Sequence, residues 1–203
     1  MRLVLVLTFL CITAPVLANH PEDRLDEVMA KKEPAFEISD RRDIPNVKFL
    51  RDNETEFGLG TMEDQIVVLS FVPNSCRLSC SDQQLLLAQV QDSISITPMR
   101  DMVKFVTVTS EASVSVGKSV HYSITVRPNH ENSVATLAST FALLSTREGT
   151  EPMVHIIDRG GRHAGIFHGS GFSHINMVLY INGLTNAHPH EPSLMQRFLG
   201  MFR

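Results

Sequence analysis

The sequence lacks the features that identify several common classes of protein. It has no excess of positive charge, because its net charge is -4 and its pI is about 6.1, so nothing suggests a nucleic-acid partner. Beyond its first residues, no stretch is apolar enough to cross a bilayer. Serine, histidine and aspartate are present without a nucleophile elbow, and "HGSG" (168–171) lacks the spacing of a phosphate-binding loop. No hydrolase triad or nucleotide site is therefore indicated.

The composition that remains is that of one globular domain. The chain has 203 residues, of which 43% are hydrophobic and 20% charged. Strand-like and helix-like segments alternate along it. We expect a hairpin over 46–60, strands over 65–72, 102–110, 121–126, 153–161 and 163–169, and helices over 80–93, 132–144 and 175–187. This alternation predicts an α/β fold with a central mixed sheet flanked by helices and an N-terminal hairpin.

The first residues resemble a signal peptide. Arg2 gives a positive start, residues 3–12 are almost all apolar, and the following "APVLA" ends in the small residue Ala18. We therefore expect a signal peptide over 1–18 and a periplasmic or otherwise extracytoplasmic protein. The run is short for a stable membrane anchor, although an uncleaved N-terminal anchor remains the alternative.

Charged and amphipathic segments flank the predicted domain. We expect a charged N-terminal arm over 19–43, the domain over 44–190 and an amphipathic tail over 191–203. Docking on the domain is the simplest role for this tail, and contact with a partner or a membrane surface is the alternative.

Of the three cysteines, Cys11 lies within the expected signal peptide. The other two, Cys76 and Cys80, stand four positions apart in "FVPNSCRLSC" (71–80), between an apolar strand and a predicted helix. A disulfide over so short a loop constrains the unfolded chain little, so a purely structural bridge is disfavoured. A redox pair and a metal site remain. The start of a helix favours thiolate, which suits both chemistries, and soft thiolates suit copper(I).

Several segments together resemble the Sco/SenC family of exported, thioredoxin-like proteins. These are the hairpin and strand leading into C-x-x-x-C, the pair "LLLAQVQ" and "MVKFVTVTSE", and the late hairpin "IIDRGGRHAGIFHG". The resemblance covers roughly residues 44–187. It implies a thioredoxin-like fold in which the redox-active pair Cys76 and Cys80 binds copper and also forms a disulfide.

The resemblance implies a role in assembling the copper centre of cytochrome c oxidase. The implied partners are a copper-accepting oxidase subunit or its assembly factors, together with a thiol protein as redox partner. Two alternatives stay open: an exported thioredoxin-like disulfide reductase without a copper role, and a scaffold paralogue without a metal site. An enzymatic role as a thiol–disulfide oxidoreductase is thus undecided, and a non-enzymatic metallochaperone is the leading interpretation.

The chain departs from the family pattern at the third copper ligand. Where the family places a histidine, this chain has Thr150, and Ser81 stands where a proline commonly follows the second cysteine. His155 is our first choice for a third ligand, although a hydrogen-bonded core histidine is the simpler role for a residue in an apolar strand.

The remaining candidates near the predicted site are less specific. His163 and His168 are expected at the surface, and His188 and His190 in a solvated tail. Met153 is a further soft donor, although methionine is more often core filler. Pro152 stands where thioredoxin-like reductases carry a cis-proline, and ordinary turn chemistry is the alternative.

Overall fold

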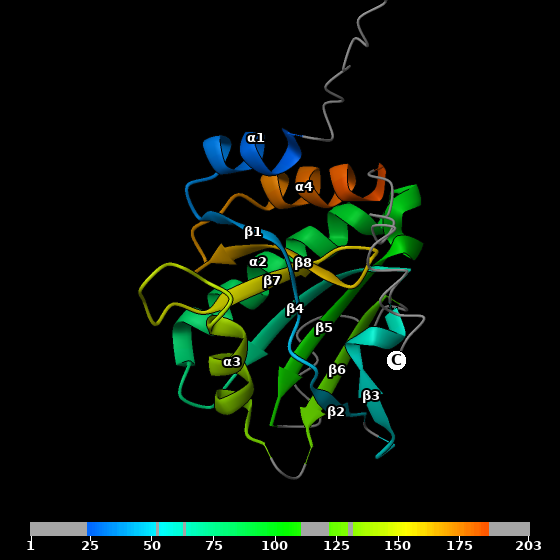
Figure 1. The fold of residues 1–203 in the computed structure, drawn as a ribbon, viewed down its shortest axis with the longest axis vertical. Coiled ribbons are helices and arrows are strands. Elements are labelled where there is room, and N and C mark those ends of the chain that lie inside the picture. Colours follow the sequence, from blue (N-terminus) through cyan, green and yellow to red (C-terminus); the bar gives the residue numbers. More distant parts are fainter. Residues whose placement is uncertain (1–23, 52, 63, 111–121, 130–131, 187–203) are drawn as a thin grey trace, which may run out of the picture.

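The computed structural model describes residues 24–51, 53–62, 64–110, 122–129 and 132–186 (Figure 1). The expected signal peptide, the beginning of the charged arm and the amphipathic tail lie outside these residues, as do Cys11, His188 and His190. Within the described ranges, none of the helices combines the length and apolar content that a bilayer crossing requires.

The described residues form a mixed, eight-stranded sheet in the order β1-β8-β7-β4-β5-β6-β2-β3. Its strands are β1 (Phe36–Asp43), β2 (Lys48–Leu50), β3 (Glu56–Gly58), β4 (Ile66–Val72), β5 (Val103–Thr109), β6 (Ser123–Pro128), β7 (Met153–Ile157) and β8 (Arg162–His168). β4 pairs in parallel with β5, and β5 with β6, whereas the other neighbours are antiparallel. The predicted α/β fold with a central mixed sheet is confirmed.

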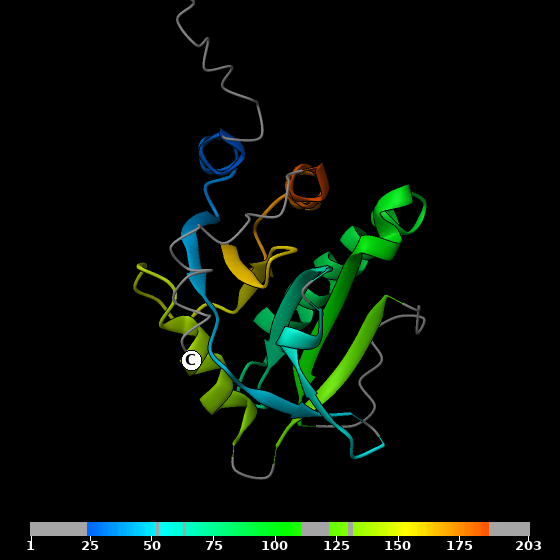
Figure 2. The same cartoon turned by 45° about the vertical axis from the view of Figure 1, so that its right-hand side comes forward.

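Helices cover both faces of this sheet (Figures 1 and 2). They are α1 (Leu25–Lys32), α2 (Arg77–Ser95), α3 (Val134–Ala142) and α4 (His174–Asn186), with short 3-10 turns η2 (Leu59–Met62) and η3 (Pro98–Met102). Side chains of α1, α2 and α4 share one apolar cluster, and those of α3 belong to a second. The sheet therefore separates two cores.

Strand β4 lies between the two cores because its apolar side chains alternate between its faces. Ile66 and Val68 belong to the cluster with α1, α2 and α4, whereas Val67, Leu69 and Phe71 belong to the cluster with α3. This is the buried central strand that the apolar run predicted. Its carboxyl end leads directly into the loop that carries the cysteines.

The domain begins earlier than the expected residue 44, because β1 belongs to its sheet. β1 pairs with β8, and Phe36 is 1% exposed in the same core as Met29 of α1. Residues 25–43 are thus part of the domain rather than an arm outside its core. The alternation of Phe36 and Ile38 was a strand signal, but the surrounding charged residues obscured it.

Candidate functional site

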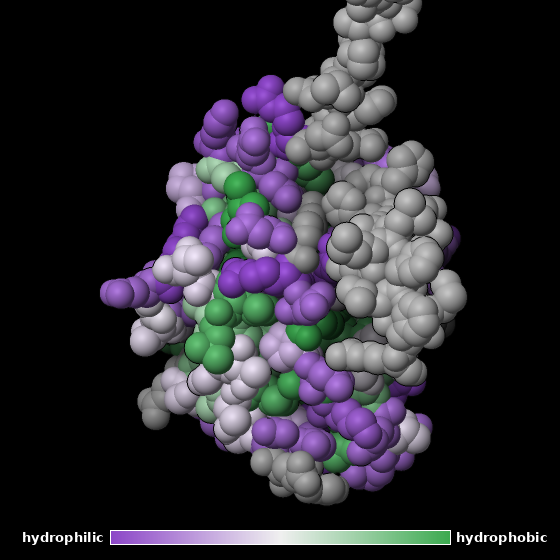
Figure 3. Space-filling model, viewed as in Figure 1, coloured by the Kyte–Doolittle hydropathy of each residue, from purple (hydrophilic) through white to green (hydrophobic). Residues whose placement is uncertain are grey.

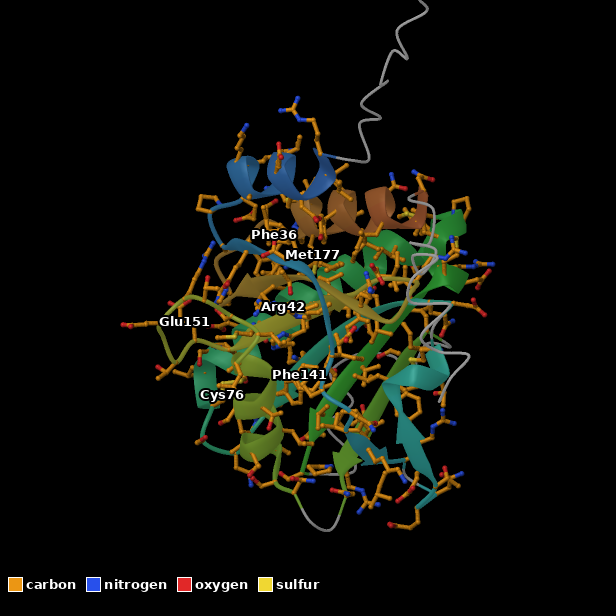
Figure 4. The ribbon with its side chains drawn as sticks, viewed as in Figure 1. Phe36, Arg42, Cys76, Phe141, Glu151 and Met177 are labelled. Atoms are coloured by element: carbon orange, nitrogen blue, oxygen red, sulfur yellow. A yellow bond between two sulfur atoms is a disulfide. The ribbon has the colours of Figure 1, made fainter. Side chains whose placement is uncertain are left out.

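A cleft of about 510 Å³ lies beside the start of α2, and the disulfide forms part of its wall. Cys76 and Cys80 line it on one side, Ala138 of α3 on another, and Glu151 and Met153 on a third. Figure 4 shows Cys76 and Glu151 near each other at this edge of the molecule. Apolar surface is visible at the level of α3 in Figure 3. The cleft thus joins three elements that are distant in sequence.

The two cysteines form a disulfide at the start of α2. Cys76 is the residue before the helix and has non-helical dihedral angles, whereas Cys80 lies in its first turn. This places the two Cα atoms 5.5 Å apart, within the range that disulfides adopt. The helix begins at Arg77, earlier than the expected residue 80, and the non-helical Cys76 brings the pair together.

The two sulfur atoms differ in their access to solvent. Cys80 is 1% exposed, and its sulfur lies 3.7 Å from the carbonyl oxygen of Phe71. Cys76 is only half-buried, and its sulfur lies 3.5 Å from the hydroxyl of Ser79. An incoming thiol therefore reaches Cys76 first.

Gln83, one helical turn after Cys80, fixes the opposite wall of the cleft. Its side-chain nitrogen donates to the carbonyl oxygens of Pro152, at 2.9 Å, and Gly169, at 2.8 Å. The backbone N–H of Gly169 also donates to the Pro152 carbonyl, at 2.8 Å. These bonds hold Pro152 beside the disulfide. No sequence pattern indicated that Gln83 has this role.

The peptide bond before Pro152 is trans, since the described residues contain no cis peptide bond. The cis alternative considered from the sequence is therefore wrong. The hydrogen bonds to the Pro152 carbonyl position the chain without the cost that a cis bond carries. The site lacks the cis-proline that thioredoxin-like reductases carry at this point.

His155 lines the same cleft from β7. It is 1% exposed, and its ring centroid lies 5.3 Å from that of Phe141 and 6.1 Å from that of Phe71. Its Nδ1 lies 3.0 Å from Nε2 of His163, in hydrogen-bonding contact. His155 is thus a hydrogen-bonded core histidine that also reaches the cleft.

His163 and His168 are buried, which corrects their expected place at the surface. His163 is 0% exposed and contacts the hydroxyl of Ser39, and His168 is 9% exposed and bonds to Glu37 at 2.7 Å. Both lie on β8, which β1 covers on its outer edge. The expected surface position followed from their place at the two ends of a hairpin strand, and nothing in the sequence indicated that β1 would pair with that strand.

Burial dominates the electrostatics of His155. Removal from water lowers the pKa of His155 well below its usual value of 6.5, and the neighbouring His163 and His168 lower it further. The ring is therefore neutral at pH 7. A neutral imidazole retains one nitrogen lone pair, which a metal ion or a proton requires.

Glu37 is a buried carboxylate that accepts several hydrogen bonds. Burial would raise its pKa, but hydrogen bonds from Ser145, Thr146 and His168 outweigh that effect and lower the pKa to about 2. These bonds tie β1 to the segment that precedes Gly149, which lines the cleft. Glu37 is therefore placed to hold one wall of the site.

The cysteines carry the donors that a soft metal needs, but only after reduction. Among the described residues, no group of three or more His, Cys, Asp or Glu side chains is close enough together to hold a metal ion. In the disulfide, the sulfurs of Cys76 and Cys80 are bonded to each other and offer no thiolate. Reduction supplies two thiolates at one helix start, a donor type that fits copper(I).

Comparison with known proteins identifies the fold. No family model matches the chain, and no curated protein matches it in sequence. Its structure resembles BsSco, a Sco family cytochrome c oxidase assembly protein with a disulfide switch, at 9% identity over 72% of this chain and 96% of that chain (TM-score 0.56). A SCO1/SenC family lipoprotein from Bacillus anthracis matches over the same shares at 14% identity (TM-score 0.55).

A third similar structure is ScoI from Bradyrhizobium japonicum with copper bound. It is 10% identical over 70% of this chain and 99% of that chain, with a TM-score of 0.51. Sequence identities this low show the fold alone. The chain therefore has a thioredoxin-like fold, with a disulfide at the start of α2. Its fold is the one that Sco/SenC proteins have, which confirms the resemblance at the level of the fold.

Proposed function

We propose that the chain is an exported metallochaperone of the Sco type. It would bind copper(I) through reduced Cys76 and Cys80 and assist assembly of the copper centre of cytochrome c oxidase. The observation that carries this proposal is the disulfide at the start of α2, which opens on the same cleft as His155. Two of the similar structures support it, because one is an assembly protein with a disulfide switch and another has copper bound.

The first step of this function is reduction of the disulfide. A thiolate of a partner dithiol protein attacks the sulfur of Cys76, which is the more accessible of the two, and Cys80 leaves as a thiolate. The partner's second thiolate then attacks the partner sulfur of the mixed disulfide, and Cys76 leaves as a thiolate. The partner ends as a disulfide, and this chain gains two electrons as a pair of thiols or thiolates.

Copper binding follows from the reduced pair. Copper(I) replaces the remaining thiol protons and is held between two sulfur donors. His155 is the third donor that we propose, through the ring nitrogen Nε2, because Nδ1 contacts His163. In the disulfide form, His155 and the two sulfurs are not grouped closely enough to hold a metal ion, so this ligand would have to approach them after reduction. The acceptor would be an oxidase subunit or one of its assembly factors.

An extracytoplasmic location accords with this chemistry. The N-terminal segment 1–18 has the pattern of a signal peptide, and one similar structure is a SenC family lipoprotein. Whether residues 1–18 are removed or anchor the chain is decided by N-terminal sequencing of the exported protein.

A thiol–disulfide reductase without a copper role is the second candidate. Cys76 supports it, because its side chain is partly exposed and it stands directly before a helix. Both features favour attack on a partner disulfide. The trans bond before Pro152 weighs against it. The two candidates differ in one measurable property, which is retention of copper.

We expect the reduced protein to bind one copper(I) ion, and we expect Cys76→Ser or Cys80→Ser to abolish competitive binding. Removal of one thiolate leaves a single thiolate donor, which cannot compete with a strong chelator. The measurement is anaerobic titration against a chromogenic copper(I) chelator.

Ser79→Ala is the matched control for this titration. Ser79 lies between the cysteines and contacts the sulfur of Cys76, but its hydroxyl is not a soft donor. It should retain copper as the wild type does. Equal retention by a Cys76→Ser/Cys80→Ser double variant would refute the proposed site, and disulfide reductase activity without copper binding would favour the second candidate.

We also expect dithiothreitol to reduce the disulfide without unfolding the domain. The bridge closes a loop too short to constrain the unfolded chain much, and neither apolar core includes the two cysteines. Its reduction potential should lie above about -300 mV, the bound below which structural disulfides fall. Equilibration with glutathione gives the potential, and circular dichroism follows the fold. Loss of helical signal upon reduction would return the bridge to a structural role.

A further inference from the structure

Three buried side chains form a hydrogen-bonded chain that runs across the sheet to the cleft. Ser39 contacts Nδ1 of His163, and Nε2 of His163 lies 3.0 Å from Nδ1 of His155. Ser39 and His163 are 0% exposed, and His155 is 1% exposed. The three residues come from β1, β8 and β7, which are neighbours in the sheet. Side chains from three strands thus converge on one imidazole at the cleft.

A bulge in β1 points Ser39 toward this chain. The pairing of β1 with β8 shifts between Ile38 and Arg42, so three residues of β1 lie opposite one residue of β8. Asp40, within the bulge, has a φ of 48°, in the left-handed region that non-glycine residues rarely adopt. Bulges redirect side chains and are common near functional sites. In this chain, Ser39 follows the last paired residue before the bulge and is buried in contact with His163.

When His155 and His163 are both neutral, two proton arrangements satisfy this chain of hydrogen bonds. In the first, Nδ1–H of His155 donates to His163, and Nδ1–H of His163 donates to Ser39, so Nε2 of His155 retains its lone pair. In the second, every donor is reversed, and Nε2 of His155 carries a proton. The two arrangements differ in what His155 offers to the cleft.

The surroundings of His155 favour the first arrangement. Among the described residues, its Nε2 has no hydrogen-bond partner, and its neighbours include the rings of Phe71 and Phe141. A buried N–H without an acceptor is rarer in proteins than an acceptor without a donor. The first arrangement avoids such an N–H.

We propose that Ser39 and His163 are positioning residues that fix the tautomer of His155, so that Nε2 faces the disulfide cleft with its lone pair. Metal-bound histidines commonly donate their other N–H to a partner in this way. The use of that lone pair for copper rests on the proposed function. The tautomer itself is a property of the copper-free protein and is tested without metal.

The first experiment measures the tautomer in the full chain, labelled with ¹⁵N, reduced and free of copper. Two-bond proton–nitrogen correlations distinguish protonated from unprotonated ring nitrogens. We expect Nδ1 of His155 to be protonated and Nε2 to be unprotonated. The reverse assignment would overturn the proposal, whatever the protein does with copper.

The second experiment uses variants at the two positioning residues. Ser39→Ala should give His155 a mixture of tautomers, and Ser39→Thr, which retains a hydroxyl, should restore the wild-type state. We expect copper(II) to bind as well, with His155 as its nitrogen donor. His163→Phe should then weaken copper(II) binding by about tenfold or more and remove nitrogen hyperfine splitting from the electron paramagnetic resonance spectrum. His174→Gln, at a histidine that begins α4 and does not line the cleft, is the matched control and should leave both readouts unchanged.

The outcomes separate this inference from the proposed function. If the reduced wild type binds no copper, the proposed function is refuted. The measured tautomer of His155 then still tests whether Ser39 and His163 are positioning residues. If copper binds but Ser39→Ala and His163→Phe retain the wild-type tautomer and spectrum, the positioning role is refuted. If His163→Phe does not fold, the wild-type and Ser39→Ala tautomers decide it.

Discussion

Replacing Gly165 with alanine is expected to lower the free energy of unfolding by about 3 kcal/mol, because the new methyl group has no space. A Cβ atom at this position in β8 would lie 2.4 Å from Cε2 of Phe36 and 3.1 Å from the carbonyl oxygen of Glu37. The Phe36 ring has little freedom to move, since it packs against Phe167 and Tyr180 with centroids 5.0 Å and 4.6 Å away. The substitution should therefore weaken the pairing of β1 with β8.

Urea denaturation followed by circular dichroism measures this effect. Gly171→Ala is the matched control, because Gly171 follows β8 in an exposed position and a Cβ there would meet no atom within 4 Å. The control should unfold as the wild type does. Equal stability of both variants would mean that β1 does not pack on β8 as closely as described.

Glu37→Ala is expected to cost about 3 kcal/mol as well, because it removes the shared acceptor of several hydrogen bonds, among them the bond from the buried His168. The carboxylate accepts from the Ser145 hydroxyl at 2.6 Å, from the Thr146 N–H at 2.6 Å and from His168 at 2.7 Å. Glu37 itself is 7% exposed, so water has little access to the carboxylate to compete with these bonds. The same change should loosen the wall of the cleft and speed reduction of the disulfide.

The contribution of Glu37 should depend on pH. Its pKa is about 2 in the folded protein and near 4.5 when unfolded, so the unfolded state binds the proton first as pH falls. The stabilisation is therefore complete above about pH 4.5 and is lost as pH falls toward 2, by at most about 3 kcal/mol. Glu37→Ala should lack this part of the acid sensitivity.

Glu56→Ala is the matched control for Glu37→Ala. Glu56 also lies on a strand and pairs with Lys48 at 2.8 Å, but both side chains are mostly exposed. Water replaces such a contact, so we expect little change in stability. Denaturation midpoints at pH 7 and pH 3 would compare the two variants. Equal acid sensitivity of Glu37→Ala and the wild type would contradict the role assigned to Glu37.

Features that depend on neighbouring residues were predictable from the sequence. The apolar run of β4 and the helical spacing of α3 follow from periodicity, which reports the local environment of each segment. The order of strands and helices, with two cysteines at a helix start, was enough to predict the thioredoxin-like fold and the resemblance to Sco proteins. The position of Cys76 and Cys80 in the cleft followed from that order.

The tertiary structure decided the features that depend on pairing between distant segments. Pairing of β1 with β8 brought Ser39 to His163, placed Glu37 beside His168 and buried both histidines, although more than 120 residues separate the members of each pair. Gln83 and Pro152 met through the packing of α2 on the loop before β7. Local patterns carry no information on such contacts, because each partner's burial depends on a strand or loop far away in the chain. The sequence by itself thus determined the cysteine pair and its scaffold, whereas only the folded chain determined what surrounds His155.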